Sequence, residues 1–257
     1  MPSAPISTRA SAGAGPSHRA LVAKAARIEA ALTEAYGVRI WRRENYSDDL
    51  VGALVATILS QNTSDLNSGR AFASLRARFG DDWEAVRTAP TVEVEDAIRS
   101  GGLAQVKAPR IQRVLDQVHD THGATSLESL REWDDDRIRA YLKSLPGVGA
   151  KTAACILMFN LGRPALAVDT HVHRVAGRLG LIGERTTADR AHDELESLVP
   201  PPERYSFHVH LIEHGRRICH AQRPECSNCP VNGECVWYRI QKETSLRAAN
   251  QRKERKQ

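Results

Sequence analysis

The sequence predicts an all-α protein. Only 5% of its 257 residues are aromatic, so its apolar content of 41% comes largely from leucine, valine, isoleucine and alanine. Apolar residues recur at spacings of three and four along most of the chain, and no stretch alternates apolar and polar residues as a half-buried strand does. Glycine, proline, serine or aspartate stands at each join between these segments. This pattern favours packed helices over a β-sandwich or barrel.

The helices follow one another closely along the chain. The first is expected at 20–36, where apolar residues repeat with helical spacing up to Gly37. Residues 48–60 (DDLVGALVATILS) start with an aspartate cap and are otherwise almost wholly apolar, which predicts a helix buried on all sides. Further helices are expected at 65–79, 91–99, 107–121, 134–144, 150–161, 170–180, 187–198 and 203–218.

Both ends of the chain are polar. Residues 1–17 are rich in Ser, Ala, Pro and Gly and predict a disordered tail, and 241–257 form a charged C-terminal tail. The N-terminal segment lacks the apolar region of a secretory signal, and no apolar run is long enough to span a membrane. We therefore expect a cytoplasmic protein whose thiols stay reduced. The net charge of +5 suggests a polyanionic partner without proving one.

A tight turn stands out in residues 142–154, LKSLPGVGAKTAA. Pro146, Gly147, Val148 and Gly149 separate two expected helices, and glycine permits positive φ and close backbone approach. Exposed amides beside a helix N-terminus can bind a phosphate oxygen. An ordinary helical hairpin would need only one glycine. The doubled glycine therefore resembles a helix–hairpin–helix element that contacts the DNA backbone without reading its sequence.

Two charged residues follow this turn. Lys151 begins a helix whose continuation is apolar on nearly every side, and partial burial and the helix dipole both favour its neutral amine. Such an amine can form a Schiff base with an aldehyde-like carbon, although phosphate binding explains its position equally well. Asp169, in AVDTHVHRV, is either a plain N-cap or a carboxylate that faces a cleft near Lys151. In the cleft it could stabilise positive charge on a sugar or take part in proton transfer.

Four of the five cysteines, Cys219, Cys226, Cys229 and Cys235, lie in the segment CHAQRPECSNCPVNGEC. Four thiolates at this spacing can hold a [4Fe–4S] cluster or a zinc ion. Structural zinc usually uses two Cys-x-x-Cys pairs set well apart, and only one such pair occurs here, so the spacing slightly favours iron–sulfur. Disulfides are the weakest interpretation. Neighbouring arginines, Arg223 among them, indicate that the loop is basic and faces phosphate.

The hairpin LPGVGAKTA, the segment AVDTHVHRV and the spacing C-x6-C-x2-C-x5-C, in this order, resemble the endonuclease III family of helix–hairpin–helix DNA glycosylases. The resemblance covers about 28–240. It implies two helical domains that flank a DNA-binding groove. A six-helix barrel with the hairpin would occupy 45–163, and an iron–sulfur domain would combine 18–44 with 164–240.

The resemblance also implies a role for several side chains. Lys151 matches the catalytic lysine and Asp169 the catalytic aspartate of the family. Leu103, in SGGLAQVKA, matches a wedge that enters the base stack, although it could be an ordinary packed loop residue. The pair Gln61-Asn62 matches the loop that fills the gap left by the flipped base. The family commonly has Ala-Gln there, so the shorter Asn62 takes the gap-filling position, which leaves the range of lesions open.

The function implied by the resemblance is removal of oxidised pyrimidines from duplex DNA, followed by strand cleavage at the apurinic/apyrimidinic (AP) site. It further implies one [4Fe–4S] cluster, a monomer, no membrane, and a location with the nucleoid in a prokaryote. Three alternatives remain open. One is a glycosylase of the same fold with mismatch or uracil preference, or with mainly lyase activity. The others are a non-catalytic, metal-stabilised DNA-binding protein and a zinc protein of unrelated function.

Six histidines in the last third of the chain suggest a second metal site. No carboxylate–histidine spacing accompanies them. We therefore expect most of them to be polar or DNA-facing, namely His171, His173, His208, His210, His214 and His220. Cys155, outside the quartet, is expected to be a small core residue.

Overall fold

The computed structural model of the protein describes residues 16–254. Most of the expected N-terminal tail, 1–17, lies outside the described residues. Inside them every regular element is helical and no strand occurs, so the all-α prediction is confirmed. None of the described helices is long and apolar enough to cross a membrane.

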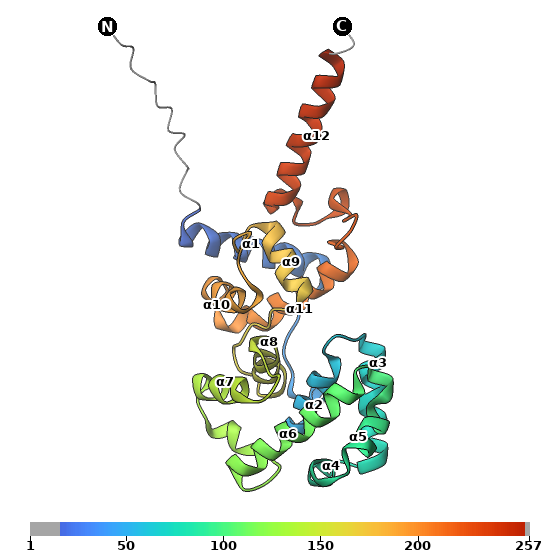
Figure 1. Cartoon of the computed structure of the whole chain (residues 1–257). Coiled ribbons are helices and arrows are strands. Elements are labelled where there is room, and N and C mark those ends of the chain that lie inside the picture. The colour runs from blue at the N-terminus through green and yellow to red at the C-terminus, as the bar shows by residue number, and fades with distance from the viewer. Residues whose placement is uncertain (1–15, 255–257) are drawn as a thin grey trace, which may run out of the picture.

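The middle of the chain folds around one hydrophobic core and forms the lower half of the molecule in Figure 1. A π-helical turn, Ile156–Asn160, continues the last helix of this half, so the helix expected at 150–161 changes its hydrogen-bond pattern halfway. The helices of this half are α2 (Leu50–Ser60), α3 (Asp65–Phe79), α4 (Trp83–Thr88), α5 (Thr91–Ile98), α6 (Ala104–His122), α7 (Asp135–Ser144) and α8 (Ala150–Cys155).

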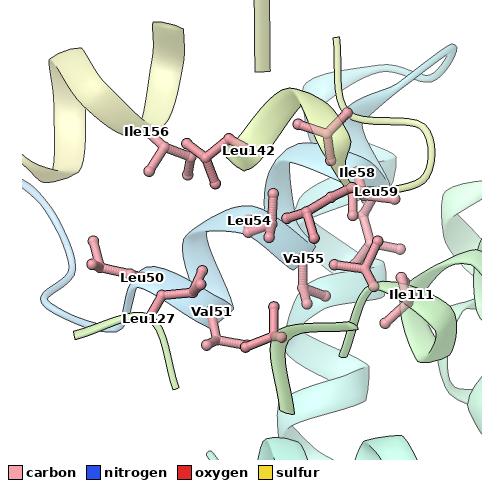
Figure 2. Packing of buried hydrophobic residues seen from close by; sticks show 14 of the residues in the cluster. Leu50, Val51, Leu54, Val55, Ile58, Leu59, Ile111, Leu127, Leu142 and Ile156 are labelled. Atoms are coloured by element: carbon pink, nitrogen blue, oxygen red, sulfur yellow. The ribbon is translucent and has the colours of Figure 1, made fainter. Parts of the chain in front are cut away.

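Helix α2 forms the centre of this core. Figure 2 shows its leucines, its valines and Ile58 surrounded by residues of other segments, such as Ile111, Leu142 and Ile156. Asp49 caps the first turn, as the sequence predicts, and accepts a hydrogen bond from the amide of Gly52 (2.8 Å). Because α2 is packed on all sides, its C-terminal end is a rigid base for the loop that follows.

The remaining helices form the upper half in Figure 1 around a second core. The chain enters this half twice, first as its N-terminal helix and again after residue 161. The last helix projects from the body of the molecule (Figure 1). The helices are α1 (His18–Tyr36), α9 (Thr170–Leu179), α10 (Ala188–Leu198), α11 (Arg204–Arg217) and α12 (Val236–Glu254), so much of the expected C-terminal tail, 241–257, continues as helix.

Polar contacts join the two halves. Arg139 of α7 pairs with Glu196 of α10 (3.1 Å), and the same carboxylate accepts a hydrogen bond from the amide of Leu166 (2.9 Å). The hydroxyl groups of Tyr46 and Tyr205 lie 2.6 Å apart. These contacts fix the segment that runs from the first core to the start of α9.

Three of the six histidines are buried, so the expectation of polar or DNA-facing side chains is wrong for them. His208, His210 and His214 are each at most 2% exposed. The Nδ1 atom of His210 lies 3.1 Å from the carboxylate of Glu29, and Nδ1 of His214 lies 2.8 Å from the hydroxyl of Tyr36. His210 and His214 find these partners because α11 packs against α1, a tertiary contact that helical periodicity alone does not reveal.

Candidate active site

An open groove of about 810 Å³ lies where the two halves meet. Arg216 of α11 reaches Asp65 of α3 across it, with 2.9 Å between nitrogen and oxygen. The loop after α2, the hairpin turn and the start of α9 all contribute to its walls. Its lining includes Gln61, Asn62, Gly147, Lys151, Asp169, His171, His173 and Arg216. The structure therefore brings together residues that the sequence predicts for one site from three separate segments, and α11 adds Arg216.

The hairpin turn forms one wall. Gly147 has φ +75°, and a Cβ there would lie 2.6 Å from Cδ of Arg110, so only glycine fits. Val148 is buried in the core and anchors the turn. Gly149 is extended, and nothing lies within 4 Å of a Cβ at that position. It gives α8 no side-chain cap, so the turn presents bare backbone at the start of that helix.

Lys151 and Asp169 face the same groove. Lys151 is half-buried in the first turn of α8. Asp169 is the N-cap of α9, and its Oδ1 accepts a hydrogen bond from the amide of Val172 (2.8 Å). Within residues 16–254, Oδ2 of Asp169 has no such bond. One oxygen therefore caps the helix and the other can act on groups in the groove, so the two interpretations of Asp169 are compatible.

A buried layer supports this pair. Cys155 follows Lys151 by one helical turn, and burial raises the pKa of its thiol although the nearby Lys151 opposes the shift. Nδ1 of His208 lies 2.7 Å from the carbonyl of Ala167, so this nitrogen carries the proton of a neutral ring. Burial lowers the pKa of His208 to about 4, although that carbonyl and Asp169 oppose the shift. His208 thus holds the segment that ends at Asp169.

The burial of His208 predicts acid sensitivity. Its folded pKa lies below the ordinary 6.5, so the unfolded chain binds a proton more readily as the pH falls from about 6.5 to 4. The free energy of unfolding should be insensitive to this group above that window and fall by on the order of 2 kcal/mol at pH 5. His208→Asn keeps a donor for Ala167 but cannot titrate. Urea unfolding at pH 7 and 5 should show a smaller loss in the variant, and equal losses would contradict this account.

The candidate gap-filling loop, the candidate wedge loop and the cysteine loop each contain a residue with unusual backbone. Asn62 (φ +55°), Leu103 (φ +53°) and Arg223 (φ +51°) are non-glycine residues in the left-handed region. Leu103 is 56% exposed, and Asn62 is exposed at the groove. The amide of Gln61 instead donates to the carbonyl of Gly147 (3.0 Å). Strained backbone of this kind concentrates at functional sites. Gln61 is anchored in this way, whereas the side-chain amide of Asn62 has no hydrogen bond among the described residues.

The four cysteines of the quartet line one cavity beside α9. Among the described residues, no three His, Cys, Asp or Glu side chains come together as they would around a single metal ion. A zinc ion needs four ligands about 2.3 Å from one point. Four thiols around a shared apolar cavity fit a larger group better. The apolar walls are Val175, Leu179, Ile218, Val231 and Trp237.

Burial opposes ionisation of the Cys229 thiol, whereas hydrogen-bond donors orient two of the other thiols. Burial raises the pKa of Cys229 to about 11, so a bound cation must supply the energy to ionise it. Arg178 donates to Sγ of Cys219 (3.3 Å), and the amide of Tyr238 donates to Sγ of Cys235 (3.4 Å). Donors of this kind stabilise thiolates and orient ligands. The residues present therefore fit an iron–sulfur cluster.

Helix α9 connects the cysteine loop with the groove. Arg174 donates to the carbonyl of Cys219 (3.0 Å), and Arg178 donates to those of His220 (2.7 Å) and Ala221 (2.9 Å). The helix that begins at Asp169 thus also holds the first part of the loop. Sequence reasoning missed these arginines, although their spacing of four on an amphipathic helix places them on one face.

A family model describes the HhH-GPD superfamily base excision DNA repair protein and matches residues 55–201, more than half of the chain. A protein of Arabidopsis thaliana named as a candidate DNA glycosylase is 36% identical over 189 residues, which cover 74% of this chain and 61% of the relative. The match therefore spans less than two thirds of that relative. Endonuclease III of Thermotoga maritima is 33% identical over 215 residues, which cover 84% of this chain and 96% of the relative.

Two solved structures show the same architecture. A non-covalent endonuclease III–DNA complex matches with a TM-score of 0.73 and 27% identity, over 86% of this chain and 98% of that chain. A trapped endonuclease III–DNA covalent intermediate matches with a TM-score of 0.70 and 28% identity, over 88% and 99% of the two chains. The chain belongs to the HhH-GPD superfamily of base excision DNA repair proteins and is an endonuclease III-like DNA glycosylase.

Proposed function

We propose that the enzyme removes oxidised pyrimidines from duplex DNA and then cleaves the strand at the resulting AP site. The observation that carries the proposal is the presence of Lys151 and Asp169 in one groove, beside a hairpin that presents bare backbone. A lysine amine can form a Schiff base with the sugar, so Lys151 favours a bifunctional enzyme. The trapped covalent complex among the similar structures supports the same chemistry.

The chemistry starts with a flipped nucleotide in the groove. The amine of Lys151 attacks the anomeric carbon C1′, and the glycosidic bond breaks with its electron pair leaving on the base, which takes up a proton. Asp169 stabilises the positive charge that develops on the sugar and accepts a proton from the attacking amine. The sugar ring opens to give a Schiff base between Lys151 and C1′.

Strand cleavage follows from the same Schiff base. Loss of a proton from C2′ sends its electron pair toward C3′, and the C3′–O bond breaks by β-elimination. This leaves a 5′-phosphate on one fragment and an unsaturated imine between C1′ and Lys151 on the other. Water then hydrolyses the imine and returns the free amine. Each step uses only water and the side chains that line the groove.

We also propose that the quartet holds one [4Fe–4S] cluster and that the enzyme acts as a monomer. When bound, the cluster would supply structural cross-linking of the cysteine loop, because the four cysteines lie beside the end of α9 that is far from Asp169. Cys219, Cys226, Cys229 and Cys235 would hold it. The loop between the first two ligands presents Arg223 to solvent, where it can contact a DNA phosphate.

A panel of lesions tests the substrate. Duplexes with one thymine glycol, dihydrouracil, uracil, G·T mismatch or AP site are incubated with the enzyme, and each reaction is divided into samples with and without alkali. We expect base loss from the first two duplexes and strand breaks without alkali. Excision of uracil or mismatched thymine alone would favour the alternative, a mismatch or uracil preference. The shorter side chain of Asn62 in the gap-filling position is the observation that leaves this alternative open. Cleavage of the AP duplex alone would indicate mainly a lyase.

A further inference from the structure

Lys107 is a buried lysine that the proposed chemistry does not use. Lys107 is 2% exposed, and its amine donates to the carbonyls of Leu59 (2.6 Å) and Gly101 (3.1 Å). Lysine is almost never buried unless its donors are paired. Leu59 lies at the end of α2, three residues before Asn62, and Gly101 lies two residues before Leu103. One amine therefore contacts the backbone just before each of the two loops that contain left-handed residues.

Arg110 extends the same arrangement. It follows Lys107 by three residues on α6, so the two side chains lie on neighbouring positions of one face. Its Nη1 donates to Oε1 of Gln61 (3.2 Å), and Gln61 donates in turn to the carbonyl of Gly147 (3.0 Å). The guanidinium stem also packs against Gly147 where a Cβ would sit. Arg110 thus joins the loop after α2 to the hairpin that precedes Lys151.

We propose that Lys107 and Arg110 are positioning residues that fix the gap-filling loop at Asn62, the wedge loop at Leu103 and the hairpin relative to one another. The inference rests on the proposed function, because it assigns these residues to the flipping step. Left-handed backbone at Asn62 and Leu103 persists only while surrounding contacts hold it. Without the amine of Lys107, two buried carbonyls lose their donor and both loops are free to relax.

Loss of Lys107 or Arg110 should affect base excision and AP-site cleavage differently, although both reactions take place in the same groove. An intact base must be extruded and its gap filled before Lys151 can attack, so base excision depends on the loops. An AP site has no base to extrude, and its cleavage depends mainly on Lys151 and Asp169. Loss of Lys107 or Arg110 should therefore slow base excision far more than AP cleavage. A purely structural role would slow both reactions to the same degree.

The test compares Lys107→Met and Arg110→Met with the unaltered protein on duplexes that carry thymine glycol or an AP site. Single-turnover base excision should fall by more than about tenfold, because small displacements of positioned groups are costly. AP cleavage should stay within about threefold. If Lys107→Met does not fold, the rates of base excision and AP cleavage are compared in Arg110→Met alone. Equal losses on both substrates would overturn the proposal.

Gln112→Met is a matched control on the same helix. Gln112 is 8% exposed, and its amide donates to the carbonyls of Val86 (3.2 Å) and Ala89 (2.8 Å), which lie at the end of α4 and not in either loop. This variant also removes buried hydrogen bonds but leaves Leu59 and Gly101 paired. Its ratio of base excision to AP cleavage should match that of the unaltered protein. A ratio as low as that of Lys107→Met would contradict the proposal.

A second measurement keeps this inference separate from the proposed function. We place 2-aminopurine opposite a stable AP-site analogue, where its fluorescence rises if the loops displace it from the stack. The unaltered protein should raise the signal and Lys107→Met should not, whatever the glycosylase activity. Equal signals in both would refute the role of Lys107. Failure to excise any base, with the signals as expected, would overturn only the proposed substrate.

Discussion

Replacement of Lys151 by alanine is expected to abolish AP-site cleavage while DNA affinity stays close to that of the unaltered protein. The amine is the only nucleophile that the mechanism assigns to the groove, so cleavage should fall by at least about 10³-fold. The hairpin backbone that faces the groove is unchanged by the substitution. Single-turnover nicking of an AP duplex measures the first effect, and fluorescence anisotropy of a labelled duplex measures the second.

Lys143→Ala provides the control for this prediction. Lys143 is exposed on α7, the other helix of the hairpin, and has the same charge. If Lys151 only binds phosphate, the two variants should lose affinity similarly and Lys151→Ala should still cleave. A variant without Lys151 that cleaves AP sites at a normal rate would refute its role as nucleophile.

Cys229→Ala is expected to have the second largest effect. Cys229 is a proposed ligand, burial raises the pKa of its thiol to about 11, and Nε2 of His214 lies 3.5 Å from its sulfur. Without it the protein should lose iron and visible absorption, and the loop held by Arg174 and Arg178 should loosen. The free energy of unfolding should fall by several kcal/mol, roughly as when other small metal-held elements lose their metal. Iron and sulfide analysis, visible spectra and thermal melting measure these changes.

Cys155→Ala is the matched control, because this cysteine lies in the first core and outside the quartet. It should keep a full complement of iron. Iron that persists in Cys229→Ala would show that this thiol is not a ligand. One zinc ion per chain in the unaltered protein, with no iron, would refute the cluster itself.

The sequence predicts the elements whose signals are local. The buried helix α2 with its cap Asp49 follows from an apolar run after an aspartate, and the turn at Gly147 follows from its glycine and proline. Helix α4, Trp83–Thr88, was missed because six residues are too few to show a period. The C-terminal helix, α12, was interpreted as a tail because its composition is mostly polar.

The residues that sequence reasoning missed depend on tertiary contacts. Lys107 occupies the same stripe of α6 as the buried Ile111, Val114 and Val118, and a lysine in an apolar stripe was an available signal. The burial of His208 had no such signal, because its partner is a backbone carbonyl in a distant segment. Likewise, the different roles of Gln61 and Asn62 emerge only when the hairpin is placed beside them.

Borohydride trapping tests the central claim most directly. The unaltered protein is mixed with duplexes that carry thymine glycol, dihydrouracil or an AP site, then reduced, and the adduct is digested and mapped. We predict a covalent protein–DNA species on all three duplexes, with the DNA fragment attached to Lys151. The absence of an adduct on every duplex, with DNA binding intact, would contradict the Schiff-base mechanism and favour a non-catalytic DNA-binding protein.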